Sequence, residues 1–95
     1  MIKTTHALER VYALTPAVGP RAFRRLDDEI ARHKDLRGDV AVCIRIPPTK
    51  NPLGRTHSRC DLLVALIRGG RVTSYMLSRS QQKDPAHFRV QRVIF

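Results

Sequence analysis

Tryptophan is absent from this 95-residue chain, and tyrosine and phenylalanine together make up 5% of it. Stacking platforms for single-stranded bases are therefore scarce, and the core must consist mainly of valine, leucine, isoleucine and alanine. The aromatic residues are Tyr12, Phe23, Tyr75, Phe88 and Phe95. Because a chain of this length has room for one hydrophobic core, we expect a single domain over residues 1–95.

Cysteine is also scarce, and the two cysteines, Cys43 and Cys60, form no C-x-x-C pair. We therefore expect no disulfide framework. The longest apolar run, Leu62 to Ile67, is six residues, whereas a membrane-spanning helix needs roughly 20. The first residues lack the apolar stretch of a secretory signal. These absences predict a soluble, cytoplasmic protein that makes no contact with a membrane.

Acidic side chains are few, whereas basic ones are abundant. The chain has 18 lysines and arginines against 8 aspartates and glutamates, a formal net charge of +10, and 14 of the basic residues are arginines. Self-repulsion of like charges works against compaction, so this excess indicates a polyanionic partner, most commonly RNA or DNA. Arginine also makes bidentate contacts with phosphate. A GC-rich genome would favour arginine codons as well, but it would not lower the number of acidic residues. The composition predicts binding to nucleic acid, with RNA favoured.

Two helices are predicted in the first part of the chain. The first covers residues 6–14, is capped by the threonines just before it, and is expected to end at Thr15, because a residue that precedes a proline is pushed away from helical angles. The second begins at Pro20, since proline is tolerated in the first turn, and its segment ends at Gly38. Its apolar residues recur at helical spacing, which predicts one buried face.

From residue 39 the apolar pattern changes to a period of two, which is typical of strands. Pro47-Pro48 is expected to stop the first strand, and Gly69-Gly70 predicts a tight hairpin turn. The four predicted strands cover residues 40–46, 61–67, 72–78 and 88–95. We therefore expect an α+β domain in which two N-terminal helices pack on a mainly antiparallel four-stranded sheet.

The first predicted helix carries His6 and Arg10 four residues apart, so both project from the same face. A histidine titrates near neutral pH, and a neighbouring arginine favours its neutral, basic form. This pair suits proton abstraction from a ribose 2′-hydroxyl, which makes His6 a catalytic candidate and Arg10 a candidate for binding nucleic acid. The alternative is an exposed helix face with an incidental histidine.

The predicted return strand of the hairpin supplies a second group of candidates. Strict alternation places Thr73, Tyr75, Leu77 and Arg79 on one side of it. A face with a hydroxyl, a phenol and a guanidinium suits phosphate, and Arg79 would stabilise the charge that develops on a scissile phosphate. Thr73 and Tyr75 are then binding candidates. The alternative is a solvent-facing sheet surface, on which Thr and Tyr occur simply as strand formers.

The segment 49–59 is predicted to be a loop that contacts substrate, because loops on a rigid scaffold often carry binding groups. Lys50, Arg55 and Arg59 are its candidates for binding nucleic acid. His57 is its candidate general acid or base. The alternative is a solvated surface loop without a ligand.

No metal or cofactor site is expected. His57 and Cys60 have no second ligand pair at zinc-finger spacing, and the few carboxylates cluster on the second predicted helix. The chain also has no Walker loop, GxGxxG, HExxH or GxSxG motif. Any cleavage of nucleic acid is therefore expected to be metal-independent and to act on RNA, in which the 2′-hydroxyl supplies the nucleophile.

Two segments, His6 to Arg10 and the hairpin Asp61 to Arg79, resemble small bacterial domains of the barnase–EndoU–colicin–RelE-like ribonuclease superfamily. That resemblance implies N-terminal helices on an antiparallel sheet and, in several members, toxins that cut RNA alongside a neutralising partner protein. It would make His6 a base or acid, and Arg10 and Arg79 phosphate-stabilising residues. Many members with this fold have lost nuclease activity.

The leading hypothesis from the sequence is a toxin-like, metal-independent ribonuclease of a bacterium or its phage, with a neutralising acidic protein as a candidate partner. A second hypothesis is a non-catalytic nucleic-acid-binding or phage accessory module, in which the same arginines position phosphates. A third is a basic regulator that binds an acidic protein surface, such as that of an RNA polymerase subunit.

Overall fold

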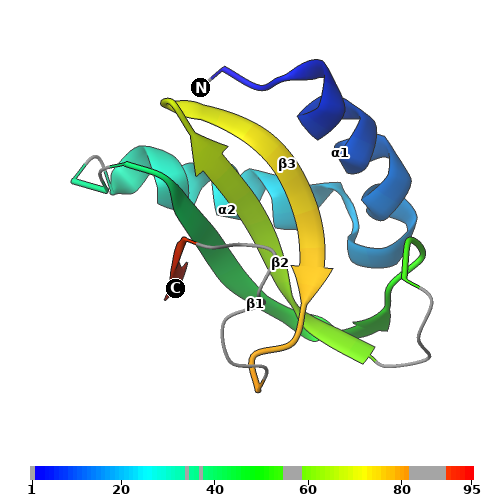
Figure 1. The fold of residues 1–95 in the computed structure, drawn as a ribbon. Helices are drawn as coiled ribbons and strands as arrows, with labels where there is room; N and C mark the ends of the chain where they lie inside the picture. The colour runs from blue at the N-terminus through cyan, green and yellow to red at the C-terminus, as the bar shows by residue number, and fades with distance from the viewer. Residues whose placement is uncertain (1, 34, 37, 55–58, 82–89) are drawn as a thin grey trace.

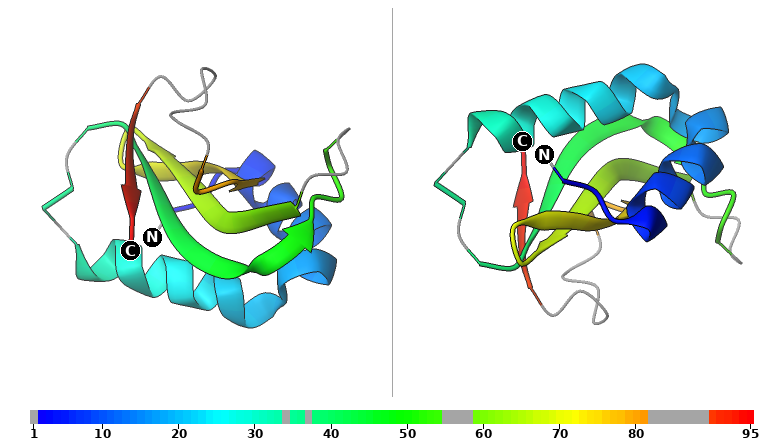
Figure 2. Two further views of the ribbon diagram at one scale, coloured as in Figure 1. Left: turned by 90° about the horizontal axis from the view of Figure 1, so that it is seen from below. Right: turned by 90° about the horizontal axis from the view of Figure 1, so that it is seen from above.

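A computed structural model describes residues 2–33, 35–36, 38–54, 59–81 and 90–95. Two N-terminal helices pack on one face of a four-stranded sheet, which confirms the predicted α+β class (Figure 1; Figure 2). The elements are α1 (Thr5–Val18), α2 (Pro20–Arg32), β1 (Val40–Lys50), β2 (Arg59–Arg68), β3 (Arg71–Ser78) and β4 (Gln91–Ile94). Among the described residues, no helix has the length and apolar character required to cross a membrane.

The strand order is β3-β2-β1-β4. β1 pairs with β2 and β2 with β3 in antiparallel fashion, as predicted. β4 instead pairs with β1 in parallel, from Val40 opposite Gln91 to Cys43 opposite Ile94, so the sheet is mixed. β3 and β4 therefore run in the same direction, on opposite sides of the β1–β2 pair.

α1 begins as predicted, because the Thr4 Oγ1 accepts a hydrogen bond from the Ala7 N–H at 3.2 Å. The predicted end at Thr15-Pro16 is wrong, since α1 continues to Val18 with Pro16 inside it. Pro16 has no N–H to donate to the carbonyl of Tyr12, four residues earlier. Both residues lie on the exposed side of α1, where water can bind this carbonyl instead. α2 ends at Arg32, well before Gly38, and the apolar spacing of its sequence correctly gives its buried face.

β1 does not stop at Pro47-Pro48 but continues through both prolines to Lys50. The register explains why. Arg45 lies opposite Leu62 and Thr49 opposite Cys60, so β1 has extra residues in this interval and forms a bulge. Prolines are tolerated at a bulge because it leaves ladder positions that need no N–H donor. Thr49, Lys50 and Arg59 consequently lie in strands and not in the predicted loop.

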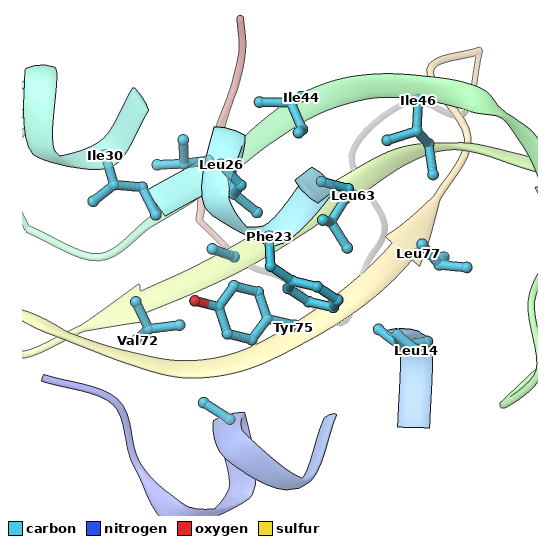
Figure 3. Close-up of a cluster of buried hydrophobic side chains, with 14 of the residues drawn as sticks. Leu14, Phe23, Leu26, Ile30, Ile44, Ile46, Leu63, Val72, Tyr75 and Leu77 are labelled. Atoms are coloured by element: carbon cyan, nitrogen blue, oxygen red, sulfur yellow. The ribbon is translucent and has the colours of Figure 1, made fainter. Parts of the chain in front are cut away.

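The main core lies between the helices and the sheet, and side chains of both helices meet those of the three long strands there (Figure 3). Its largest fully buried side chain is Tyr75, whose ring meets Phe23 edge-on at 5.1 Å. A second apolar cluster covers the opposite face of the sheet, centred on Ala41, Cys43 and Leu62, each 0% exposed. Both faces of the central strands therefore carry buried apolar side chains.

Candidate nucleic-acid interface

Four arginines lie around Asp61 and the segment that directly follows β3. Arg45, in the middle of β1, lies opposite Leu62, which lies opposite Ser78, so the register brings Arg45 near the end of β3. The four members, called the arginine cluster below, are Arg45, Arg59, Arg79 and Arg92. Three strands, and the residue that directly follows β3, therefore supply this concentration of guanidinium groups.

Arg59 and Arg79 line one surface pocket of about 190 Å³, together with Pro48, Asp61 and Gln81. Both guanidinium-bearing residues are exposed. Arg79 also lies close enough to Cys60 to act on its thiol electrostatically. The pocket thus offers two donors of the kind that bind phosphate oxygens bidentately.

Asp61 is the acidic member of this pocket, and hydrogen bonds from Ser80 hold both of its oxygens. The Ser80 N–H donates to Oδ1 at 2.8 Å, and the Ser80 hydroxyl donates to Oδ2 at 2.5 Å. These hydrogen bonds, the side-chain one foremost, lower the pKa of Asp61, and the positive charge of Arg45 lowers it further. Asp61 is therefore an ionised hydrogen-bond acceptor near neutral pH and a poor general base.

Arg92 of β4 connects this strand to the site. Its guanidinium donates to the carbonyl of Arg79 at 3.3 Å and to that of Ser80 at 3.4 Å. Since Asp61 binds the N–H and hydroxyl of Ser80, the short segment after β3 is held from two sides.

The charge of the arginine cluster is not neutralised within the described residues. The lysine and arginine ion pairs there join Lys3 to Asp27, Arg32 to Glu29 and Arg68 to Asp39. No member of the cluster forms an ion pair in this part of the chain, and one carboxylate, Asp61, stands among four guanidinium groups. The described residues around Asp61 and the segment after β3 consequently carry a net positive charge.

The structure does not bring His6 and Arg79 together. Thr4, just before α1, hydrogen-bonds to Val72 and Thr73 at the beginning of β3. Arg79 follows the last residue of β3, six residues beyond Thr73, which corresponds to about 20 Å of extended strand. His6 is exposed in the first turn of α1, near the beginning of β3, and Arg10 is half-buried one turn further along α1. His6 therefore cannot act on one phosphate with Arg79, and Arg10 does not line the pocket.

The predicted exposed face of β3 is wrong. Leu66 lies opposite Ser74 and Ile67 opposite Val72, so Thr73 has no partner residue on β2 and forms a bulge in β3. Its hydroxyl donates to the Leu66 carbonyl at 3.1 Å. Tyr75 is 0% exposed, because this face of β3 packs against the helices. Its hydroxyl donates to Asp27 Oδ1 at 2.6 Å. Burial, followed by this hydrogen bond and the charge of Asp27, raises the pKa of Tyr75. Neither Thr73 nor Tyr75 belongs to the pocket.

Of the loop candidates, Arg59 lies in the pocket, and Lys50 is exposed opposite it at the end of β1. Arg55 and His57 lie outside the described residues. Arg45, Arg92 and Asp61 were not among the residues predicted from the sequence. Alternation along β1 already places Arg45 on the opposite face from Ile44 and Ile46, but the parallel pairing of β4, which locates Arg92, has no local signal.

Both cysteines are buried. Burial raises the pKa of Cys43 to about 11, and the charge of Arg92 offsets this in part. Burial also raises the pKa of Cys60. Within the described ranges, no three His, Cys, Asp or Glu side chains are grouped so that they could hold a metal ion.

Comparisons with family models, with curated proteins and with solved structures each gave no match to this chain.

Proposed function

We propose that this protein binds RNA in the cytoplasm, with the phosphate backbone lying across the arginine cluster. The observation that carries the proposal is the presence of four guanidinium groups, unpaired with any described acid, around Asp61 and the segment that follows β3. Arginine matches the geometry of phosphate, and a patch of one sign raises the local concentration of a polyanion.

Contacts to phosphate, and not to bases, dominate this proposed interaction. Among the described residues, no aromatic side chain lines the pocket, and Phe23 and Tyr75 are buried in the core. Backbone contacts position a nucleic acid without reading its sequence. Affinity for RNA should therefore depend strongly on salt and weakly on sequence.

Metal-independent cleavage of RNA at the same pocket is a second candidate function. It is favoured by Arg79, which shares the pocket with Arg59, and by His57, two residues before Arg59 in the sequence. In this proposal Arg79 stabilises charge on the phosphate and His57 transfers the proton, whereas His6 takes no part. A toxin-like ribonuclease with a neutralising acidic partner, as the resemblance implies, is the form that this candidate takes.

The binding proposal is tested with the double variant Arg59→Gln/Arg79→Gln and a fluorescently labelled single-stranded RNA. For single strands, log affinity falls with log salt at a slope of about 0.7 per phosphate contact, so losing two contacts should lower the slope by about 1.4. The matched control is Arg21→Gln/Arg24→Gln, which removes two exposed arginines of α2 that also lack ion pairs in the described part. Equal losses in both double variants would show that binding is diffuse.

Cleavage is tested separately, by incubating the protein with total RNA in the presence of a chelator. Fragments that end in cyclic phosphate, and that disappear with Arg79→Gln and with His57→Ala, are the result that the ribonuclease proposal predicts. Salt-sensitive binding without any fragments would leave the protein a non-catalytic RNA-binding module. A stable complex with an acidic protein and no retention of RNA would contradict both proposals.

A further inference from the structure

The segment directly after β3 is fixed although it lies beyond the strand ladder. Ser78 is the last residue of β3, so Arg79 and Ser80 have no strand partner. Asp61 instead holds the N–H and hydroxyl of Ser80, and Arg92 holds the carbonyls of Arg79 and Ser80. These four hydrogen bonds fix the backbone from which the Arg79 side chain extends.

An acidic residue in this place requires an explanation. If Asp61 acted through its charge alone, it would repel a phosphate bound between Arg59 and Arg79 and lower the affinity. Both of its oxygens, however, already accept hydrogen bonds from Ser80. Its geometry is that of a residue that orients a neighbouring segment.

We propose that Asp61, together with Arg92, is a positioning residue that preorganises Arg79 for phosphate. This inference rests on the proposed RNA-binding function of the arginine cluster. A binding group that is already held in its bound arrangement loses less conformational freedom when the ligand arrives, and this increases affinity. The gain in RNA affinity from holding Arg79 in place is larger than the loss caused by repulsion between the Asp61 carboxylate and the phosphate.

The two roles of Asp61 predict effects of opposite sign. Asp61→Asn removes a negative charge, so charge alone would make RNA bind more tightly. Positioning predicts weaker binding, by about fivefold, which corresponds to the loss of about one hydrogen bond. The measurement is the RNA affinity of Asp61→Asn at fixed salt. The matched control is Asp39→Asn, because Asp39 also accepts a backbone hydrogen bond, from Gly69, at the opposite end of β2.

A double-mutant cycle separates positioning from a general effect on folding. In the Arg79→Gln background there is no guanidinium at position 79 for Asp61 to position. Asp61→Asn should then leave the RNA affinity unchanged, or raise it because a negative charge is removed. Ser80→Ala removes one hydrogen bond and leaves the repulsive charge of Asp61 in place, so it should weaken RNA binding in the wild-type background by at least as large a factor as Asp61→Asn. The RNA affinity of Ser80→Ala also tests the positioning role if Asp61→Asn unfolds the protein.

Tighter binding by Asp61→Asn in both backgrounds would overturn the positioning role. Equal weakening in both backgrounds would also overturn it, because Asp61 would then act independently of Arg79. If Arg59→Gln/Arg79→Gln bound RNA as tightly as the wild type, the proposed function itself would fail, whatever the result for Asp61.

Discussion

The hydrogen bond between Tyr75 and Asp27 should make a measurable contribution to the stability of the fold. Asp27 Oδ1 accepts from the Tyr75 hydroxyl at 2.6 Å, and Oδ2 lies 2.6 Å from Lys3 Nζ. Tyr75→Phe removes the hydroxyl and keeps the ring against Phe23. A hydrogen bond to a charged group contributes about 1.5–3 kcal/mol. The Asp27 side chain is 29% exposed and keeps its ion pair with Lys3 in this variant. Water can therefore replace part of the lost hydrogen bond to Oδ1. We expect a loss at the low end, about 1.5 kcal/mol.

Thermal and urea denaturation followed by circular dichroism measure this loss. For a domain of this size, about 1.5 kcal/mol corresponds to a fall in Tm of about 6–12 °C. The matched control is Tyr12→Phe, since Tyr12 is 88% exposed, and its Tm should stay close to that of the wild type. A double-mutant cycle with Asp27→Asn should give a coupling between the two residues. If Tyr75→Phe were as stable as the wild type, the hydrogen bond would contribute nothing and the reasoning would be refuted.

Three further predictions follow from the ionisable groups. The Cys43 thiol is 0% exposed and burial raises its pKa to about 11. It should therefore react with a thiol reagent at least about a hundredfold more slowly in the folded than in the unfolded protein. Equal rates in the two states would show that the thiol is accessible. The pKa of Asp61 is lowered on folding, so its stabilising contribution is present above its unfolded value of 3.8 and lost as the pH falls through the folded pKa. Asp61→Asn should therefore lose less stability than the wild type between about pH 5 and pH 2, and an identical acid profile would contradict this. The pKa of Tyr75 is raised, so its contribution is present below its unfolded value of 10.0 and lost at higher pH. In Tyr12→Phe, whose remaining tyrosine is Tyr75, phenolate absorbance should appear together with alkaline unfolding; ionisation while the protein is still folded would show that the phenol is not buried.

Features of the fold that depend on local chemistry could be predicted from the sequence. The apolar residues of α2 recur at helical spacing and lie in the core, and Gly69 and Gly70 adopt φ angles of 57° and 74° in the predicted hairpin turn. The path of β1 through Pro47-Pro48 could not be predicted in this way, because a bulge depends on the register with β2. The parallel pairing of β4 likewise depends on the tertiary arrangement.

The candidate site was predicted in part. Arg59 was predicted from the positive charge of segment 49–59, and the structure places it in the pocket. Arg79 was predicted from its alternation with Thr73 and Tyr75, and it lines the same pocket although neither of those residues does. Alternation along β3 correctly predicts that Tyr75 and Ser74 lie on opposite faces of the sheet. It does not determine which of these faces is covered by the helices. The separation of His6 from Arg79 follows from the length of β3 and from the attachment of Thr4 to its first residues.

Whether the arginine cluster binds phosphate is tested by a nuclear magnetic resonance titration of the isotope-labelled protein with a short single-stranded RNA. The arginine Nε–Hε signals are the readout. We predict that the largest shifts fall on the arginine cluster and that they shrink as salt is added. The exposed arginines of α2, such as Arg21 and Arg24, should change little. Shifts concentrated on α2, or spread evenly over the arginines, would contradict a phosphate-binding site at the arginine cluster.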